Sequence, residues 1–513
     1  MAWPARPTVY ELNTAVWLER LGRDIGTRPL LLDEVPDRVW DALAALPADA
    51  VWLMGVWRRS PAGLRIALAN PDIVAGNRAA LPDLRPEDII GSPYCVRDYV
   101  VDDRFGGPDG LAAAREKLAQ RGLRLILDYV PNHVAPDHPW LTDRPECFIT
   151  GTADDVAQHP EAFVQTDGGI VANGRDPYFP PWPDVVQLNA FAPALREAVG
   201  ELLVELGAHC DGLRCDMAML LTNEVFARTW GDRAGPGPAD EYWPVLIARA
   251  KQAHPDMLFM AEAYWDMEWT LQQQGFDLCY DKRLYDRLVH ENAASVRGHL
   301  QADSAYQERL IRFIENHDEP RAAATFGAEQ ARAAAVVMST LQGARLYHDG
   351  QLDGHRVHIP VFLGRGPDEP PDSDLLAFYD RLLQGVADAD VHHGAWSLCD
   401  CTGWPDNQSA QQLVAWCWAN DRGRHLVVVN LADAPAQAHV HVPWGEDLRG
   451  HQWDLADALS GETFQRDGDE LAGDGLYVAL EPWGAYVFLL AGSSIAAPSP
   501  TAPNPTSVTS AAT

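Results

Sequence analysis

Eight short apolar, β-rich runs recur through the first two thirds of the chain, and most are separated by Ala-, Leu- and Arg-rich stretches with helical spacing. The runs are VYELNTAVWL (9–18), AVWLMGVW (50–57), LRLILDYV (123–130), DGLRCDMA (211–218), MLFMAEAYW (257–265), FDLCYD (276–281), RFIENHD (312–318) and ARLYHDG (344–350). Eight strands that alternate with helices are typical of a closed parallel barrel. The repeat therefore predicts the α/β class, with a catalytic (β/α)8 TIM barrel over residues 1–134 and 185–392.

Two segments between the runs carry further signals. GPDGLAAAREKLAQRG (107–122) places Ala and Leu at helical spacing and ends on Gly, which predicts a helix between the second and third strands. Residues 135–184 are irregular and rich in Pro, Asp and Trp, and they are too many for an ordinary strand-to-helix loop. We expect them to form a short insert domain after the third strand that acts as a lid or a substrate wall.

The pattern changes after about residue 392. Alternating runs such as LVAWCWA and HLVVVNLA, with turn residues between them, predict a separate C-terminal antiparallel β-sandwich over 393–492. Trp396, Trp416 and Trp418 lie in these alternating runs, so we expect them to pack in a core. Residues 493–513 are rich in Ser, Pro, Thr and Ala and lack large apolar side chains, which predicts a disordered tail.

The charge of the chain restricts its partners. With 40 Lys and Arg against 73 Asp and Glu, the formal net charge is −33, which argues against nucleic acid or an anionic membrane as a partner. A neutral or cationic ligand is easier to accommodate. The 18 Trp residues supply flat apolar faces that pack well on sugar rings, although most of them are expected in the core.

The compartment is predicted from three features. No apolar run reaches membrane-spanning length, and the amino terminus shows no secretory leader. The eight Cys residues are scattered without metal-ligand or disulfide spacing, so we expect reduced thiols in a cytoplasmic protein. Cys215 precedes Asp216, but neighbours on a strand point to opposite faces, so a structural role is expected for this thiol. The sequence leaves the oligomeric state open.

Acidic residues stand at the ends of several predicted strands. The third ends in Asp128, the fourth in Arg214 and Asp216, the fifth in Glu262 and the seventh in Asp318. In a parallel barrel these ends meet at one mouth, where active sites lie. A single acid there can cap a helix or pair with an Arg, but several acids in apolar strand sequence are costly unless they are paired or used. Three converging carboxylates therefore predict a reaction site.

Cleavage of a glycosidic bond needs such a set. One carboxylic acid protonates the leaving oxygen while a carboxylate attacks the anomeric carbon, and a third acid can stabilise the positive charge that develops. Arg214 lies two residues before Asp216 and is predicted to keep that carboxylate ionised and to lower its pKa. Glu262 must instead stay protonated.

Four ordered motifs resemble the signatures of the α-amylase clan, glycoside hydrolase family 13. They are DYVPNH (128–133), GLRCDMA (212–218), AEAYW (261–265) and ENHD (315–318), with a weaker fifth motif, QLN (187–189). The resemblance covers roughly residues 8–490 and implies a retaining mechanism with a covalent glycosyl intermediate. Four motifs in order on predicted strands are a specific signal, whereas any one alone would be weak.

The resemblance implies a role for each matching residue. Asp216 would be the nucleophile, Glu262 the acid/base and Asp318 the residue that stabilises the transition state. The implied substrate-binding residues are Arg214, His133, His317, Asp128, Tyr94, Tyr264 and Trp265. Within this set, Arg214 would orient Asp216, the two histidines would bind sugar hydroxyls, and Tyr94 would stack on the same sugar.

Some positions depart from the family pattern. Met219 and Leu220 stand where endo-acting α-amylases commonly carry Lys and His, which weakens the case for starch endo-hydrolysis and predicts an apolar or short leaving-group pocket. VAPDHPWL (134–141) is similar to both α-glucosidases and bacterial maltosyltransferases. The resemblance implies no cofactor and no catalytic metal; a structural calcium held by Asn132 and insert acids (Asp143, Asp154, Asp155) stays open.

The sequence thus predicts an enzyme, a retaining α-glycoside hydrolase that acts on α-glucosidic bonds of gluco-oligosaccharides or α-glucans. Two alternatives remain open. The first is an α-glucan transglycosidase such as a maltosyltransferase, and the second is a non-catalytic carbohydrate-binding relative. The expected partner is a small-molecule or oligosaccharide substrate, with no nucleic acid and no membrane.

Overall fold

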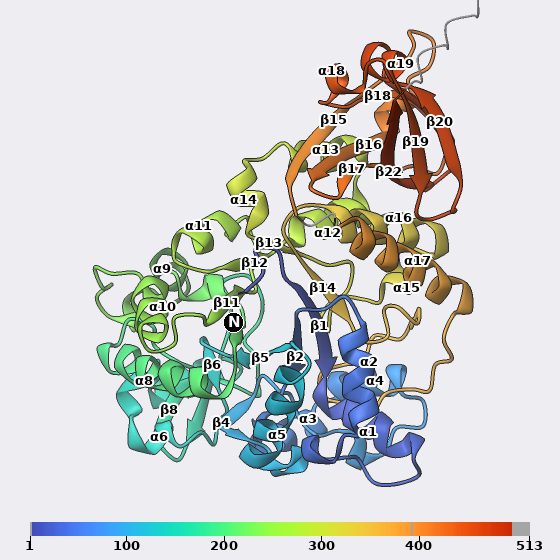
Figure 1. The fold of residues 1–513 in the computed structure, drawn as a ribbon. Coiled ribbons are helices and arrows are strands. Elements are labelled where there is room, and N and C mark those ends of the chain that lie inside the picture. Colours follow the sequence, from blue (N-terminus) through green and yellow to red (C-terminus); the bar gives the residue numbers. More distant parts are fainter. Residues whose placement is uncertain (1–2, 391–392, 495–513) are drawn as a thin grey trace, which may run out of the picture.

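The computed structural model describes residues 3–390 and 393–494 (Figure 1). In these ranges a closed barrel of eight strands forms, and every strand pairs in parallel with the next one along the chain. The strands are β1 (Thr8–Asn13), β2 (Ala50–Met54), β5 (Arg124–Tyr129), β10 (Gly212–Cys215), β11 (Leu258–Ala261), β12 (Leu278–Tyr280), β13 (Leu310–Arg312) and β14 (Ala344–His348). The predicted (β/α)8 barrel is confirmed.

Helices surround the barrel and bury the outer faces of its strands. The longer ones are α1 (Thr14–Asp24), α2 (Asp37–Ala45), α3 (Pro61–Ala69), α4 (Pro71–Ala80), α5 (Gly107–Ala119), α8 (Pro193–His209), α9 (Asn223–Trp230), α10 (Tyr242–Ala253), α12 (Lys282–His290), α13 (Ala293–Leu300), α16 (Ala328–Thr340) and α17 (Ser373–Ala389). Strands covered on both faces read as continuous apolar runs, and all residues of β2 are buried accordingly. The predicted helix at 107–122 is observed as α5.

The first predicted run, 9–18, is only half strand. β1 ends at Asn13, and α1 begins at the next residue. The side chain of Asn13 accepts a hydrogen bond from the Val16 N–H (3.4 Å) and so caps the helix. The apolar residues after Asn13 pack on the core from a helix, which periodicity in so short a run did not distinguish from a strand.

The seventh predicted run, 312–318, lies mostly beyond its strand, because β13 ends at Arg312. Phe313 and Ile314 stay buried after the strand ladder ends. Asn316 then turns the chain, since its Oδ1 accepts hydrogen bonds from the N–H groups of Asp318 (2.9 Å) and Glu319 (2.8 Å). This turn places Asp318 at the mouth of the barrel.

The segment 135–184 forms a small insert that is tied across its base. β6 (His133–Val134) pairs with β9 (Val186–Gln187) at its two ends. Between them lie α6 (Trp140–Asp143), α7 (Ala153–Gln158) and the hairpin of β7 (Phe163–Thr166) and β8 (Gly169–Ala172). Near its end the insert exposes two aromatic side chains, Tyr178 and Phe179.

The C-terminal part is an antiparallel sheet that lies beside α16 and α17 (Figure 1). Its strands are β15 (Ala395–Thr402), β16 (Leu413–Asn420), β17 (Gly423–Asn430), β18 (Ala436–His441), β19 (His451–Asp457), β20 (Thr463–Asp467), β21 (Leu476–Leu480) and β22 (Ala485–Ser494). β15 pairs with β16 at one end and with β18 at the other, and the sheet encloses a core of its own. The predicted domain boundaries stay predictions, and the predicted tail lies outside the described residues from residue 495 on.

The sheet is fastened to the barrel by two tryptophans. Trp416 and Trp418 are fully buried, and the Nε1–H groups of both donate to the carbonyl oxygen of Thr340 at the end of α16 (3.1 and 2.8 Å). Both therefore pack in a core, as expected, but it is the barrel's core that they extend. Trp396 is partly buried against the same core.

Two further observations concern the compartment. Among the helices of the described ranges, none combines the length and apolar character that crossing a membrane requires. All eight Cys residues lie in the described part of the chain, and each is a free thiol there.

Candidate active site

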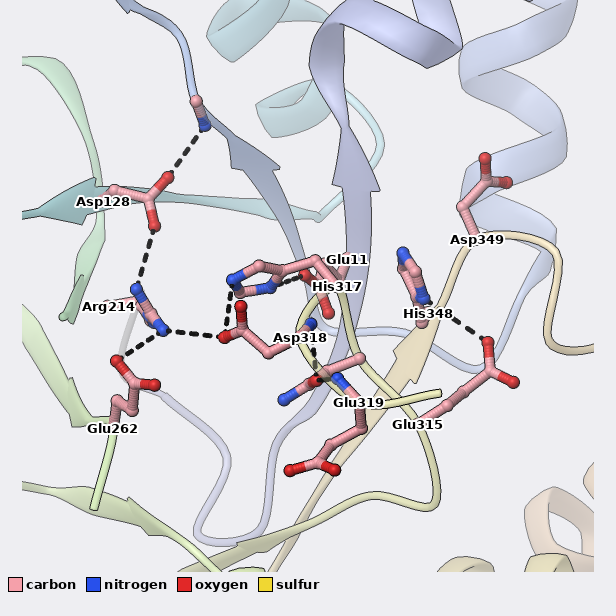
Figure 2. Close-up of polar contacts among 12 residues, drawn as sticks. Glu11, Asp128, Arg214, Glu262, Glu315, His317, Asp318, Glu319, His348 and Asp349 are labelled. Carbon is pink, nitrogen blue, oxygen red and sulfur yellow. Dashed lines mark hydrogen bonds and ion pairs between the residues drawn. The ribbon is translucent and has the colours of Figure 1, made fainter. Parts of the chain in front are cut away.

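The carboxyl ends of the barrel strands gather four acidic side chains around one guanidinium. Figure 2 shows Asp128, Glu262 and Asp318 around Arg214. Arg214, on β10, is fully buried. Its Nη1 donates to Asp216 Oδ1 (2.7 Å), and its Nη2 forms an ion pair with Glu262 Oε2 (2.7 Å). Asp128 Oδ1 and Asp318 Oδ2 each lie 3.8 Å from the same guanidinium. One positive charge cannot balance three buried carboxylates and Asp318 at their edge, so the buried acids favour retention of protons.

Glu262 directly follows β11 and is held by two neighbours. Its Oε1 accepts from the Tyr264 hydroxyl (2.9 Å) and its Oε2 from the Met217 N–H (2.6 Å). Burial raises the pKa of Glu262 to about 7, although Arg214 acts in the opposite direction. At neutral pH this carboxyl group is therefore present in both protonated and ionised forms.

Asp216 directly follows β10 and is 6% exposed. Burial raises its pKa above the ordinary range, and Asp318 and Asp128 act in the same direction. Arg214 lowers it through charge and a hydrogen bond, but it does not outweigh burial. The predicted effect of Arg214 on the pKa of Asp216 is therefore confirmed in its direction. The sequence did not reveal how fully the carboxylate is desolvated, and this burial sets the net direction of the pKa shift.

Asp318 stands at the opening of the site, with its side chain 40% exposed. Its Oδ2 lies 3.0 Å from His317 Nε2. Burial acts to raise the pKa of Asp318, but His317 and Arg214 outweigh it and lower the pKa to about 2. Asp318, the most exposed acid of the cluster, is thus ionised at neutral pH.

His317 joins Asp318 to a residue that sequence reasoning missed. Its Nδ1 lies 2.5 Å from Oε1 of Glu11, which is fully buried on β1, and its Nε2 also lies 2.6 Å from the Tyr94 hydroxyl. The two partners are 306 residues apart, so no local pattern links them. The available signal was an acid inside the apolar strand sequence VYELN.

Asp128 and Tyr94 complete the inner wall. Asp128 Oδ2 accepts from the Gly55 N–H (2.8 Å), and burial raises the pKa of Asp128 to about 6. The ring of Tyr94 stacks on His317 (5.4 Å between centroids), and the Arg214 guanidinium lies 5.2 Å from its centroid. The ring of His133 packs against Trp182 (5.1 Å between centroids).

A cavity of about 440 Å³ lies against Met217 and Tyr264, the two residues that donate to Glu262. It is lined by Asp176, Phe179, Met217, Tyr264, Trp265, Glu268, Lys282, Arg283 and Asp286. Trp265 meets Tyr178 of the insert edge to face (4.8 Å), so the insert forms part of this wall. Met219 and Leu220 are buried in the core. The cavity is lined by aromatic, aliphatic and charged side chains. The prediction of an apolar or short leaving-group pocket stays a prediction.

The residues proposed for calcium do not fit that ion. The Oδ1 of Asn132 accepts from Gln187 Nε2 (2.9 Å), and the Asp155 carboxylate is bound by Arg233 (2.6 Å) and by Thr152. Asp143 and Asp154 are exposed on the surface. In the described ranges, no group of three or more His, Cys, Asp or Glu side chains is arranged to hold a metal ion.

Comparison with curated proteins gives distant relatives. Alpha-amylase MalA of Haloarcula japonica is 24% identical over 489 residues, which cover 91% of this chain and 60% of that protein. The alpha-1,4-glucan:maltose-1-phosphate maltosyltransferase of Rhodospirillum rubrum is 25% identical over 58% of this chain and 39% of its own length. The chain thus spans about 60% or less of the length of these relatives.

Solved structures share the fold over nearly the whole chain. The maltogenic alpha-amylase AmyB of Thermotoga neapolitana superposes with a TM-score of 0.64 at 17% identity, covering 95% of this chain and 99% of that one. An alpha-amylase from H. orenii gives a TM-score of 0.65 at 17% identity, covering 95% and 100%. Residues 40–357, more than half of the chain, match the model of the alpha-amylase catalytic domain, and the chain therefore belongs to the α-amylase family.

Proposed function

We propose that the protein is a retaining glycoside hydrolase that cleaves α-glucosidic bonds of gluco-oligosaccharides or α-glucans. The observation that carries this proposal is the placement of Asp216 and Glu262 on two nitrogens of one buried guanidinium, at 2.7 Å each. Two carboxyl groups that bind the same guanidinium from neighbouring strands suit a double displacement, in which one is the nucleophile and the other the acid/base. Their environments also separate them from Asp318, which is held ionised.

In the first step, Glu262 gives its proton to the oxygen of the leaving group while a carboxylate oxygen of Asp216 forms a bond to the anomeric carbon. The glycosidic bond breaks with its electron pair on the leaving oxygen. In the second step, ionised Glu262 takes a proton from water, whose oxygen attacks the anomeric carbon and releases Asp216. Two inversions at one carbon retain the configuration. Asp318 stabilises the positive charge that develops on the sugar, and Arg214 orients Asp216.

The leaving group occupies the cavity beside Glu262. Its aromatic residues, Phe179, Tyr264 and Trp265, suit the faces of a sugar, and its charged side chains suit the hydroxyl groups. The names of distant relatives, an α-amylase, an α-glucosidase and a maltosyltransferase, support an α-glucan or a short α-gluco-oligosaccharide as substrate.

Transfer to a sugar acceptor is the second candidate, because the same cavity can hold an acceptor hydroxyl in place of water. A non-catalytic role is disfavoured, since Asp216, Glu262 and Asp318 are all present and converge on Arg214. A cytoplasmic location is part of the proposal and is supported by the free thiols of the described residues, which oxidising compartments would tend to pair.

The test compares product formation by the parent and Asp216→Asn on maltose, maltotriose, trehalose, sucrose, soluble starch and maltose 1-phosphate. Asp211→Asn is the matched control, because Asp211 lies at the opposite end of the same strand and pairs with Arg115. We expect rapid turnover of one substrate class, lost in Asp216→Asn and kept in Asp211→Asn. Equal activity in parent and Asp216→Asn would overturn the mechanism, and longer products with excess acceptor would identify a transglycosidase.

A further inference from the structure

We propose that Glu11 is a positioning residue that keeps both ring nitrogens of His317 protonated, and so keeps the sugar-binding wall of the site intact at neutral and alkaline pH. The inference rests on the proposed function for its catalytic consequence. Its structural part, the protonation of His317, can be tested without any turnover.

The geometry isolates this pair from solvent. Glu11 points from β1 into the barrel mouth and meets His317 there (Figure 2). Its Oε1 lies 2.5 Å from His317 Nδ1, and both side chains are at most 2% exposed. The second oxygen, Oε2, has no hydrogen-bond partner among the described residues. A buried carboxylate with so few other partners depends on His317 for compensation.

The groups that face the two ring nitrogens of His317 determine its protonation state. Nδ1 faces the Glu11 carboxylate, and Nε2 faces the Asp318 carboxylate at 3.0 Å. An ionised carboxylate accepts hydrogen bonds and donates none, so each nitrogen needs its own hydrogen. A neutral imidazole carries one hydrogen and would leave one carboxylate facing a lone pair. The Tyr94 hydroxyl beside Nε2 can donate or accept, so it is compatible with the doubly protonated ring.

The surrounding charges favour the same state. Several elements bring charged or titratable groups near His317. They are Glu11 on β1, Tyr94 before β4 (Val96–Val101), Asp128 on β5, Arg214 on β10 and the adjacent residue Asp318. In addition, His358 donates a hydrogen bond to the backbone oxygen of His317. Burial acts to lower the pKa of His317, but Asp318 and Glu11 outweigh it and raise the pKa well above its ordinary value.

The doubly protonated ring acts on Asp318 and Tyr94, which form the wall of the site. The imidazolium lowers the pKa of Asp318, and its Nε2–H faces the Asp318 carboxylate and the Tyr94 hydroxyl. When Glu11 is replaced by a neutral side chain, Asp318 is the main negative charge left beside the buried imidazolium. His317 should then lose its proton at lower pH, by about 1 to 3 pH units, the range over which a neighbouring opposite charge shifts a pKa.

Glu11→Gln tests the proposal, since it keeps the shape and removes the charge. NMR of the full chain labelled with ¹⁵N-histidine, with His317 assigned by its absence in His317→Asn, follows the imidazolium signal with pH. We expect the signal to persist to alkaline pH in the parent and to disappear about 1 to 3 pH units lower in Glu11→Gln. The kcat/KM ratio of parent to variant should grow with pH, by up to about tenfold per unit once His317 is neutral.

Glu11→Asp serves as the conservative rescue, because it keeps the charge on a shorter side chain; its imidazolium should persist to higher pH than in Glu11→Gln. Glu315→Gln is the matched control, since Glu315 is an equally buried glutamate that pairs with His348 and Arg321 and does not touch His317. It should leave the His317 signal unchanged. The same titration of His317 in parent and Glu11→Gln would overturn the proposal. An inactive parent that still shows the shift would refute the proposed function and support the role of Glu11.

Discussion

Replacing Glu262 with Gln should make the protein more stable at alkaline pH while it abolishes turnover. The pKa of Glu262 rises from 4.5 to about 7 on folding, because burial disfavours its charged form. Between these two values the folded state binds more protons than the unfolded state, so stability falls as pH rises through this window. At about 1.4 kcal/mol per pH unit, this residue alone removes about 3 kcal/mol between pH 4 and pH 8.

The side chain introduced by Glu262→Gln does not titrate, so its contribution to stability does not change with pH. It can also make the same hydrogen bonds as Glu262. Its carbonyl oxygen can accept from the Met217 N–H, and its amide can donate to the Tyr264 oxygen, since a hydroxyl takes either role. The stability of Glu262→Gln relative to the parent should therefore improve by about 3 kcal/mol from pH 4 to pH 8. This gain at the cost of activity is typical of residues that serve a reaction.

Urea unfolding followed by tryptophan fluorescence at several pH values measures the difference. Glu116→Gln, at an exposed position on α5, is the control and should follow the parent at every pH. Parallel curves for the parent and Glu262→Gln would refute the reasoning, because they would show that Glu262 titrates alike in the folded and unfolded chains.

Other predictions follow from single contacts. Tyr264→Phe removes a donor to the ionised form of Glu262, so the alkaline limb of kcat/KM should move up by about one pH unit, and an unchanged limb would contradict this. Trp418→Ala should lower the free energy of unfolding by about 3–5 kcal/mol, measured by urea denaturation, whereas Trp269→Ala, at a half-exposed position, should cost under about 0.5 kcal/mol. Chelation by EDTA should leave Tm unchanged, because Asn132 and Asp155 are satisfied by protein groups; a drop restored by calcium would contradict this.

The fold was predictable because each barrel strand carries a local signal. Apolar runs such as LRLILDYV and MLFMAEAYW coincide with β5 and β11 to within a few residues, and Asp128, Arg214, Asp216 and Glu262 lie where strand ends must meet. The errors came from single side chains. Asn13 starts a helix inside an apolar run, and Asn316 turns the chain after a strand that is shorter than its apolar pattern.

The electrostatics of the site were less predictable. Arg214 was correctly placed beside Asp216, but the net pKa of that acid depends on burial and on Asp318 and Asp128, which come from other strands. The pairing of Glu11 with His317 joins β1 to the loop after β13, and the acid within the apolar run VYELN gave no indication of its partner. Such contacts between residues far apart in the sequence form only when the barrel closes.

The central claim is that Asp216 carries the glycosyl group. The most direct measurement is mass spectrometry of peptides after incubation with a fluorinated α-glucosyl fluoride, which forms the intermediate faster than water releases it. We expect one added glycosyl group on the peptide that contains residues 211–218, located at Asp216 by fragmentation, and no label in Asp216→Asn. A label on another carboxylate, or products of inverted configuration from the natural substrate, would contradict it.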